Sequence, residues 1–298
     1  MKIFDINSNY KLSSVSNFND VIQKLNNMRD SDCNKGTFGT LACICGSYGM
    51  AGAAMLCGNS AVTTGAGIVK MIIPDCIYSI CASQLWENVF VPITENTPQG
   101  TFSLSAKSRI LAETESCTAA VIGCGMRVCD DTSKICDEII LKYKNCLVID
   151  ADGLNCISSH IDILSQRTTT TILTPHPKEM SRLCGKSVAE IQADRIGTAQ
   201  EFAKKYRCIV VLKGVGTVIT DGNTTFVNPT GNGCLAKGGS GDVLAGIIGS
   251  LVCQGIEPVS AAAAGVYIHG FAADECTDRM SMSCVNARDI INAVKYIM

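Results

Sequence analysis

The sequence predicts an α/β protein with a mostly parallel central sheet covered by helices on both faces. Short apolar runs alternate with longer amphipathic stretches from residue 39 onward, a pattern typical of strand–helix–strand units. The length of 298 residues suits one large domain of this class. Hydrophobic residues make up 47% of the chain, enough for a buried core. We find no internal repeat and no linker-like run of Pro and Ser.

Six apolar runs are the expected strands, and three amphipathic stretches are the expected helices between them. The strands are predicted at Leu41–Gly46, Ile68–Ile73, Ala119–Gly123, Cys146–Asp150, Thr171–Leu173 and Cys208–Lys213. The helices are predicted at Gly52–Thr64, Asp131–Tyr143 and Val188–Tyr206.

The C-terminal part is expected to form a hairpin followed by helices. Thr217–Thr220 and Thr224–Val227 flank an Asp-Gly turn, which favours a β-hairpin. Three helices are predicted after it, at Ser240–Cys253, Val259–Asp274 and Asn286–Ile297, the last with Asn286 as its N-cap.

The chain begins with a polar stretch that predicts a lead-in segment rather than a domain. Residues 1–34 contain one expected helix, at Phe18–Met28, and residues 35–298 form the single predicted domain. Residues 1–10 lack the basic start and apolar stretch of a secretory signal. No apolar run approaches the ~20 residues that span a bilayer. We therefore expect a cytoplasmic protein outside the membrane.

Charge and cysteine content narrow the class of partner. The net charge is −2 and Lys and Arg are spread along the chain, which argues against nucleic acid, since phosphate backbones require clustered basic residues. The 18 cysteines occur mostly in apolar runs, where they suit the core of a reduced protein. The chain has no Cys-x-x-Cys pair and only three histidines, so a structural zinc site is not expected. The metal ligands, if any, are unknown.

The most informative segment is the glycine-rich loop that leads into the predicted helix at residue 240. Gly239, Ser240 and Gly241 let backbone N–H groups approach a ligand closely, and a helix N-terminus attracts anions. Asp242 falls in the first turn, where a carboxylate can take a proton from a hydroxyl during phosphoryl transfer. The alternative is a tight turn with Asp242 as a helix cap. The short motif alone leaves both interpretations open.

Polar residues also follow three other predicted strands. His176 stands between two prolines after residue 173, where we favour a substrate contact over a loop histidine bonded to nearby backbone. Asp152 is expected to contact substrate or Mg²⁺ or else to cap a turn, and Asp150 to line the pocket. Lys213 can reach a phosphate. Glu179 is expected to cap or solvate the next helix.

Seven segments in order resemble the NAD(P)H-hydrate dehydratase family, over residues 35–297. They are residues 35–39 (KGTFG), 46–54 (GSYGMAGAA), 123–126 (GCGM), 148–155 (VIDADGLN), 173–180 (LTPHPKEM), 212–217 (LKGVGT) and 231–246 (GNGCLAKGGSGDVLAG). Each is weak alone, and together they are specific.

This resemblance implies a ribokinase-like, three-layer αβα fold and a repair reaction. The family uses ADP or ATP to dehydrate the 6-hydroxy hydrates of NADH and NADPH, by phosphorylating the ring hydroxyl and eliminating phosphate. We favour ADP as the donor, expect Mg²⁺ because transferring phosphates need charge neutralisation, and expect a homo-oligomer such as a homotetramer. The epimerase domain that often precedes this domain has no counterpart in the sequence, so no epimerase activity is expected.

The resemblance also assigns residues to roles. Asp242 would be the base and would contact the reactive hydroxyl, and Gly239, Ser240 and Gly241 would form the anion hole. The hydrated dinucleotide would lie against Ala53, Gly125 and His176, and Asp152 is the additional candidate for a substrate contact named above. The nucleotide would be held by Lys213, Gly214, Val215, Gly216, Thr217 and Gly241. Cys124, Cys234 and Leu235 depart from the family pattern, at positions that affect loop stiffness.

Two other functions remain open at this point. A small-molecule kinase of the same superfamily, acting on a hydroxymethylpyrimidine, a pyridoxal-type alcohol or a sugar, would use Asp242 and the anion hole alike. The segments 174–177 and 52–54 favour the dehydratase. The other alternative is a nucleotide sensor without catalysis.

Overall fold

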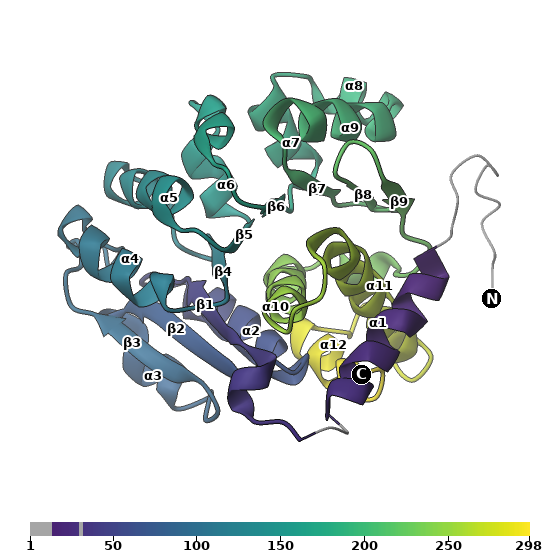
Figure 1. Ribbon diagram of the computed structural model, residues 1–298, viewed down its shortest axis with the longest axis horizontal. Coiled ribbons are helices and arrows are strands. Elements are labelled where there is room, and N and C mark those ends of the chain that lie inside the picture. The colour runs from purple at the N-terminus through teal and green to yellow at the C-terminus, as the bar shows by residue number, and fades with distance from the viewer. Residues whose placement is uncertain (1–13, 30–31) are drawn as a thin grey trace.

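The computed structural model describes residues 14–29 and 32–298 and contains a nine-stranded sheet (Figure 1). The strand order is β3-β2-β1-β4-β5-β6-β7-β8-β9. The first seven strands in this order are parallel, and β8 and β9 are antiparallel at one edge. The strands are β1 Thr40–Ile44, β2 Ile68–Pro74, β3 Val89–Ile93, β4 Ala119–Ile122, β5 Cys146–Ile149, β6 Thr171–Leu173, β7 Ile209–Leu212, β8 Val218–Thr220 and β9 Thr225–Val227.

Helices connect the parallel strands and close the chain. They are α1 Ser14–Arg29, α2 Ala51–Thr63, α3 Tyr78–Ala82, α4 Lys107–Glu115, α5 Asp130–Lys142, α6 Asp152–Ile157, α7 Pro177–Cys184, α8 Val188–Ala193, α9 Arg195–Tyr206, α10 Ser240–Cys253, α11 Pro258–Thr277 and α12 Ala287–Val294. Short 3₁₀ turns are η1 Lys35–Phe38, η2 Asp75–Ile77, η3 Leu104–Ala106, η4 Ile161–Gln166 and η5 Gly233–Leu235.

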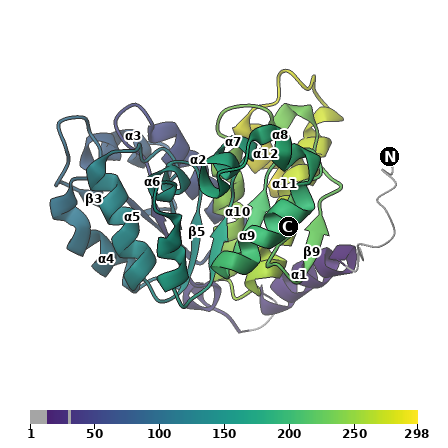
Figure 2. The ribbon, with the colours of Figure 1, turned by 90° about the horizontal axis from the view of Figure 1, so that it is seen from above.

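Alternation along each strand divides the core into two layers, which makes the fold a three-layer αβα sandwich. In β1, Leu41 and Cys43 join one core together with α1, α2 and α10–α12, whereas Ala42 and Ile44 join the other together with α4–α9. Figures 1 and 2 show these two groups of helices on opposite sides of the sheet. Side chains of a strand alternate between faces, and both faces of a parallel sheet are buried. The predicted fold class is therefore confirmed.

Most predicted elements are present, with one missed strand and one wrong helix. The strand β3 was not predicted, because it is an edge strand that is half exposed and contains Pro92, which weakens its apolar signal. The single helix expected over 188–206 is two helices, α8 and α9. Asp194 lies between them with φ −144° and ψ 79°, and its carboxylate accepts a hydrogen bond from the Gly197 amide at 2.8 Å. This cap starts a new helix.

The hairpin and the last helix are confirmed with small changes of boundary. Asp221 Oδ1 accepts hydrogen bonds from the amides of Asn223 (2.8 Å) and Thr224 (2.7 Å), which closes the turn between β8 and β9. Asn286 caps α12 as predicted, with Oδ1 accepting from the Arg288 amide at 3.0 Å. The helix ends at residue 294 instead of 297.

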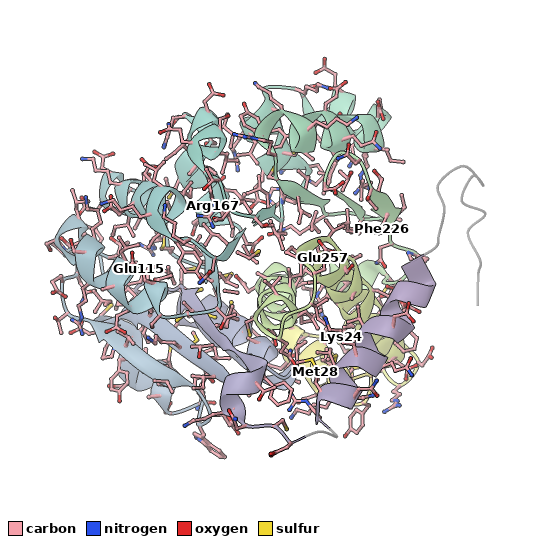
Figure 3. The ribbon with its side chains drawn as sticks, viewed as in Figure 1. Lys24, Met28, Glu115, Arg167, Phe226 and Glu257 are labelled. Carbon is pink, nitrogen blue, oxygen red and sulfur yellow. The ribbon has the colours of Figure 1, made fainter. Side chains whose placement is uncertain are left out.

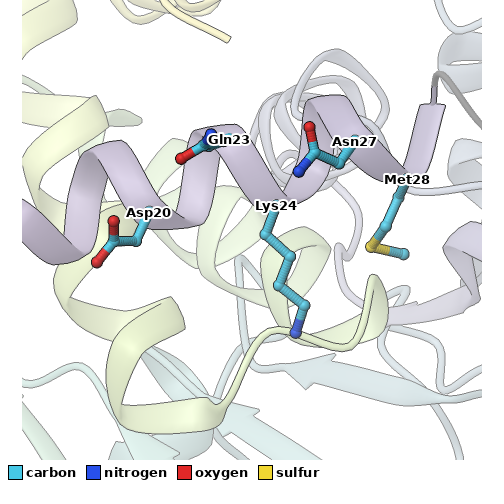
Figure 4. A pocket seen from close by; sticks show the side chains of 5 residues that line it. All are labelled: Asp20, Gln23, Lys24, Asn27 and Met28. Carbon is cyan, nitrogen blue, oxygen red and sulfur yellow. The ribbon is translucent and has the colours of Figure 1, made fainter.

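The N-terminal helix α1 packs on the domain, mainly against α11. Val21 and Leu25 are buried in the core, and Lys24 Nζ donates a hydrogen bond to the Gly255 carbonyl at 3.1 Å. A shallow pocket of about 430 Å³ lies on this helix, lined by Asp20, Gln23, Lys24, Asn27 and Met28 (Figure 4). No helix in the described ranges is long and apolar enough to cross a bilayer.

A larger pocket of about 560 Å³ lies where β6 and β7 begin. Arg167 and Glu257, both labelled in Figure 3, belong to its lining. The Arg167 guanidinium donates to the Ile140 and Tyr143 carbonyls at 2.9 and 2.5 Å, so it links its own segment to the C-terminal end of α5. This pocket therefore lies at the amino-terminal ends of these strands, whereas the candidate site lies at the carboxyl ends.

Candidate active site

The candidate site lies at the edge of the sheet where the parallel strands end. Ligands bind at the carboxyl ends of strands in open α/β sheets. The loops that leave β4, β5, β6 and β7 carry Gly125, Asp150, His176 and Lys213, and α10 begins beside them. A Cβ added to Gly241 would lie 3.4 Å from Lys213 Nζ and 3.8 Å from Asp150 Oδ2. Segments far apart in the sequence therefore meet at one place.

Lys213 and Asp150, whose side chains are 20% and 2% exposed, form a largely buried ion pair at the carboxyl ends of the strands. Lys213 Nζ lies 2.9 Å from Asp150 Oδ1, which also accepts a hydrogen bond from Thr174 Oγ1 at 2.6 Å. Glu179 Oε2 is 3.8 Å from the same ammonium. Burial lowers the pKa of Lys213, but the two carboxylates outweigh it and the net shift is upward. Lys213 is therefore a held cation and not a solvated surface lysine.

Glu179 caps a helix as predicted but is buried, not solvated. Its carboxylate accepts a hydrogen bond from the His176 amide at 2.8 Å in a capping box. Burial raises the pKa of Glu179, while the Lys213 charge acts in the opposite direction. The sequence did not indicate this burial, because a capping glutamate is normally solvent-facing.

Asp242 stands in the first turn of α10, close to two other polar groups. One ligand atom from each of Asp242, Asp150 and Cys124 lies within 4.8 Å of the others. Burial raises the pKa of Asp242 to about 6, and the negative charge of Asp150 adds to the rise. The hydrogen bond from Cys124 and the charge of Lys213 oppose it. Asp242 is thus ionised at neutral pH and more basic than an ordinary aspartate, which suits proton abstraction.

The glycine loop presents backbone donors at the start of α10. Gly239 has φ 92° and a side chain there would overlap Leu56, so both conformation and space require glycine. Within the described residues, the amides of Gly239 and Gly241 have no backbone partner, whereas the Ser240 amide donates to the Lys237 carbonyl at 3.4 Å. The Lys237 ammonium in turn binds the carbonyls of Ser283 and Val285. This arrangement can receive an anion.

A histidine to which the sequence analysis gave no role lies directly behind the loop. His269 falls in the predicted helix Val259–Asp274, is 6% exposed, and has its Nε2 3.3 Å from Ser240 Oγ. Burial lowers the pKa of His269 to about 4, so the ring is neutral at pH 7. The helix α11 is rich in Ala and Gly on all sides, so no periodic pattern marked this position as buried. His160, in contrast, is a surface residue 2.8 Å from Asp137.

Ala53 and Gly125, both predicted to contact the substrate, lie against each other. Gly125 has φ 64°, and a Cβ there would lie 2.7 Å from Ala53 Cβ. Ser47 Oγ donates a hydrogen bond to the Gly125 carbonyl at 2.8 Å. The N-terminus of α2 and the loop after β4 are thus held together, with room for a small residue only.

His176 and Asp152 both make local bonds and remain partly exposed. His176 Nδ1 accepts hydrogen bonds from the amides of Lys178 (3.1 Å) and Glu179 (3.2 Å), so the ring caps α7. Burial lowers the pKa of His176. Asp152 Oδ2 accepts from the Arg127 amide at 2.8 Å. Between Asp150 and Asp152, Ala151 has φ 48° and ψ −114°, a strained backbone of the kind found at functional sites.

The loop of residues 213–217 follows β7 and is held in place by hydrogen bonds from the Arg195 side chain. Arg195 donates to the Leu212 carbonyl at 2.8 Å and to the Val215 carbonyl at 2.6 Å. Thr217 Oγ1 closes the loop by donating to the Gly214 carbonyl at 2.9 Å. The Val215 side chain is 96% exposed at the tip. A fixed loop with an exposed apolar tip beside a lysine can hold a phosphorylated ligand with a flat apolar part.

Known proteins resemble this chain over most of its length. Residues 41–295 match the family model described as NAD(P)H-hydrate dehydratase. The ADP-dependent (S)-NAD(P)H-hydrate dehydratase of Neisseria meningitidis is 36% identical over 250 residues, 83% of this chain and 80% of that protein. The bifunctional NAD(P)H-hydrate repair enzyme Nnr of Moorella thermoacetica is 35% identical over 272 residues, 91% of this chain. This chain spans about half the length of such bifunctional relatives.

Solved structures share the fold. The ADP/ATP-dependent NAD(P)H-hydrate dehydratase of Bacillus subtilis, co-crystallised with ATP and Mg²⁺, superposes with a TM-score of 0.77 at 29% identity, covering 90% of this chain and 92% of that one. A ribokinase-like superfamily protein of Enterococcus faecalis, at 22% identity, has the same fold with a TM-score of 0.77 over 90% of this chain and 89% of that one. The chain therefore belongs to the NAD(P)H-hydrate dehydratase family and has its ribokinase-like fold.

Proposed function

We propose that this protein uses ADP or ATP to convert the 6-hydroxy hydrates of NADH and NADPH back to NADH and NADPH. The placement of Asp242 carries the proposal: a partly buried carboxylate of raised pKa stands in the same helical turn as the free amides of the glycine loop. Family membership supports the substrate class, since relatives named NAD(P)H-hydrate dehydratase match most of the chain.

The reaction proceeds by phosphoryl transfer followed by elimination. Asp242 takes the proton from the ring hydroxyl as its oxygen forms a bond to the terminal phosphorus, and AMP leaves from ADP or ADP from ATP. The amides of Gly239 and Gly241 stabilise the negative charge on the transferring group. The carbon–oxygen bond then breaks, inorganic phosphate departs, and loss of a proton from the neighbouring carbon restores the ring double bond.

We assign the remaining predicted residues to the two ligands. The nucleotide lies on residues 213–217 and Gly241, with Lys213 near a phosphate and the exposed Val215 side chain against the base. The hydrated dinucleotide lies over Ala53 and Gly125, between His176 and Asp152. The ring of His176 is oriented by the two amides that its Nδ1 accepts from, and its Nε2 lies 3.4 Å from Glu179 Oε1 on the partly exposed side of the ring.

The acidic side chains at this edge fit a Mg²⁺ ion held mainly by nucleotide phosphates. Mg²⁺ takes oxygen ligands, usually from one or two carboxylates plus substrate phosphates. Asp242 and Asp150 have carboxylate oxygens within 4.8 Å of each other, and Asp150 Oδ1 is also bound to Lys213. Asp152, the predicted Mg²⁺ contact, is not one of this group. The ion would neutralise phosphate charge.

The test is a repair assay on the purified chain with NADH-hydrate or NADPH-hydrate and either ADP or ATP. We expect recovery of the reduced-nicotinamide absorbance, with ADP as a competent donor and one phosphate released per turnover. A stable phosphorylated alcohol without recovery of absorbance would assign the protein to the small-molecule kinases instead. Binding of nucleotide without turnover of any alcohol would indicate a sensor.

We further propose that residues 35–298 are the catalytic domain, with residues 1–34 as a lead-in segment, and that the protein works in the cytoplasm as a homo-oligomer such as a homotetramer. The family match over residues 41–295 supports the domain. Sedimentation of the purified chain measures the oligomeric state.

A further inference from the structure

Three cysteines from distant parts of the chain meet beneath the candidate active site. Cys45 follows β1, Cys57 lies in α2, and Cys124 lies in the loop after β4. All three are 0% exposed, and their sulfur atoms lie within 4.8 Å of one another. A fourth, Cys43 of β1, has its sulfur 3.9 Å from that of Cys57. We call Cys45, Cys57 and Cys124 the thiol cluster.

The thiol cluster borders the groups that perform the proposed chemistry. Cys124 Sγ lies 3.8 Å from Asp150 Oδ2 and within 4.8 Å of an Asp242 carboxylate oxygen. Cys124 therefore belongs both to the cluster and to the carboxylate group of the site. A small ion that enters the site at Asp242 would reach the cluster through this residue.

We propose that the thiol cluster binds one soft, thiophilic metal ion of the Zn²⁺ class. The sulfurs of Cys45, Cys57 and Cys124 are its three ligands. Binding replaces the three S–H bonds by metal–sulfur bonds and releases the protons to solvent, so no oxidant or reductant is needed.

The geometry suits such an ion. A Zn–S bond of about 2.3 Å places two sulfurs on one tetrahedral ion about 3.8 Å apart, so the cluster needs to contract by about 1 Å at most from its 4.8 Å span. Thiolates select soft ions over Mg²⁺, which takes oxygen ligands. The cluster and the nucleotide-linked Mg²⁺ would therefore not compete for the same ion.

Each thiol of the cluster must lose its proton to bind a metal ion as a thiolate. Metal uptake at neutral pH should therefore release about three protons per ion. A single exposed thiol would release one at most.

Cd²⁺ titration of the reduced full-length chain tests the proposal. The starting variant is Cys76→Ser/Cys284→Ser, because these two cysteines are exposed. We expect one tight equivalent of Cd²⁺ with a near-ultraviolet thiolate-to-metal absorption band, about three protons released, and a rise in the unfolding temperature, since the ion binds the folded state. Zn²⁺ should compete for the same equivalent.

The controls separate the cluster from other buried thiols. Cys57→Ala and Cys45→Ala should each lose the tight equivalent and the temperature shift, whereas Cys81→Ala, which removes another 0% exposed cysteine, should keep both. A tight equivalent that persists in Cys45→Ala and Cys57→Ala, or is missing from the starting variant, would overturn the proposal. These readouts do not depend on the proposed dehydratase activity.

A second readout rests on the proposed function. An ion bound by Cys124 would remove that thiol from Asp150 and Asp242, so Zn²⁺ should inhibit turnover in the starting variant. Cys57→Ala should keep its basal turnover and lose the inhibition. Inhibition that is equal in both variants would show that the ion acts elsewhere.

Discussion

Asp242, Asp150 and Lys213 lie close together, and the charges of Asp150 and Lys213 contribute to the pKa of Asp242. Lys213 is 2.9 Å from Asp150 and pulls the pKa of Asp242 down, while burial and the Asp150 charge push it up to about 6. A base acts in its deprotonated form, so activity should be lost as the pH falls through this value. With a pKa of about 6, Asp242 is ionised at neutral pH and is still more basic than an ordinary aspartate.

The first prediction concerns the pH dependence. The acidic limb of kcat/KM should have its midpoint near pH 6 if Asp242 is the base, because that parameter reports the free enzyme. Lys213→Met removes a charge that lowers the pKa of Asp242, so the midpoint should move to higher pH. Measured pH–rate profiles of the two proteins provide the comparison, and an unchanged midpoint would argue against Asp242 as the titrating group.

The second prediction concerns the carboxylate itself. Asp242→Asn keeps the shape of the side chain but cannot accept the proton, so turnover should fall by about 10²–10⁴-fold. Nucleotide affinity, measured by calorimetry, should change only a few-fold, since the backbone amides remain. A variant with full repair activity would contradict the catalytic role.

The third prediction concerns the buried ion pair. Removing one partner leaves an uncompensated charge, so Lys213→Met should lower the free energy of unfolding by about 3 kcal/mol or more. The double variant Lys213→Met/Asp150→Asn should recover part of that loss. Urea denaturation of the single and double variants gives the two values, and additive losses would mean that the pair is not coupled.

At the scale of elements, the packing of α10 against α2 positions the first turn of α10, which carries Asp242. Gly246 of α10 lies against the Cys57 carbonyl and Ser60 of α2, and a Cβ at this position would overlap both. The absence of a side chain lets the two helices approach closely. The same helix carries Asp242 at its beginning and reaches the centre of the sheet, so a shift of α10 would move the base.

The fourth prediction tests this approach. Gly246→Ala should lower the free energy of unfolding by about 1–3 kcal/mol, as overpacking does, and should reduce turnover. The matched control is Gly52→Ala in the first turn of α2, where a Cβ meets nothing within 4 Å. That substitution should be neutral or stabilising by up to about 1 kcal/mol, from helix propensity. Equal effects of the two changes would show that close packing is not the cause.

At the scale of the whole molecule, α1 covers the helical layer that supports the site from one side. Leu25 is 3% exposed and belongs to the same core as α10 and α11. The lead-in helix is thus part of the folded unit and yet lies away from the strand ends that carry the site. Its contribution should appear in stability more than in catalysis.

The fifth prediction follows from this position. Leu25→Ala should lower the free energy of unfolding by about 2–4 kcal/mol, while the exposed Gln23→Ala should stay within about 0.5 kcal/mol. Below the unfolding transition, both variants should keep wild-type kcat and KM in the repair assay. A loss of turnover in folded Leu25→Ala would instead connect α1 to the active site.

The sequence by itself determined the α/β class, six of the nine strands in near-final position, the hairpin, and the glycine loop with Asp242. These features depend on local periodicity and turn chemistry, which any short segment carries within itself. Edge strand β3 was not predicted, because its half-exposed residues weaken the apolar signal. The break between α8 and α9 at Asp194 was not predicted either, because the helical pattern of the sequence continues through it and only the capping side chain interrupts the helix.

Tertiary structure alone decided which polar groups face each other. The pairing of Lys213 with Asp150, the burial of Glu179 and His269, and the meeting of Cys45, Cys57 and Cys124 all join residues from different elements. Cysteine spacing in the sequence indicated no metal site, since ligands for one ion were sought close together along the chain. Burial and electrostatic coupling depend on distances through space, which the parallel sheet creates by gathering distant strand ends at one edge.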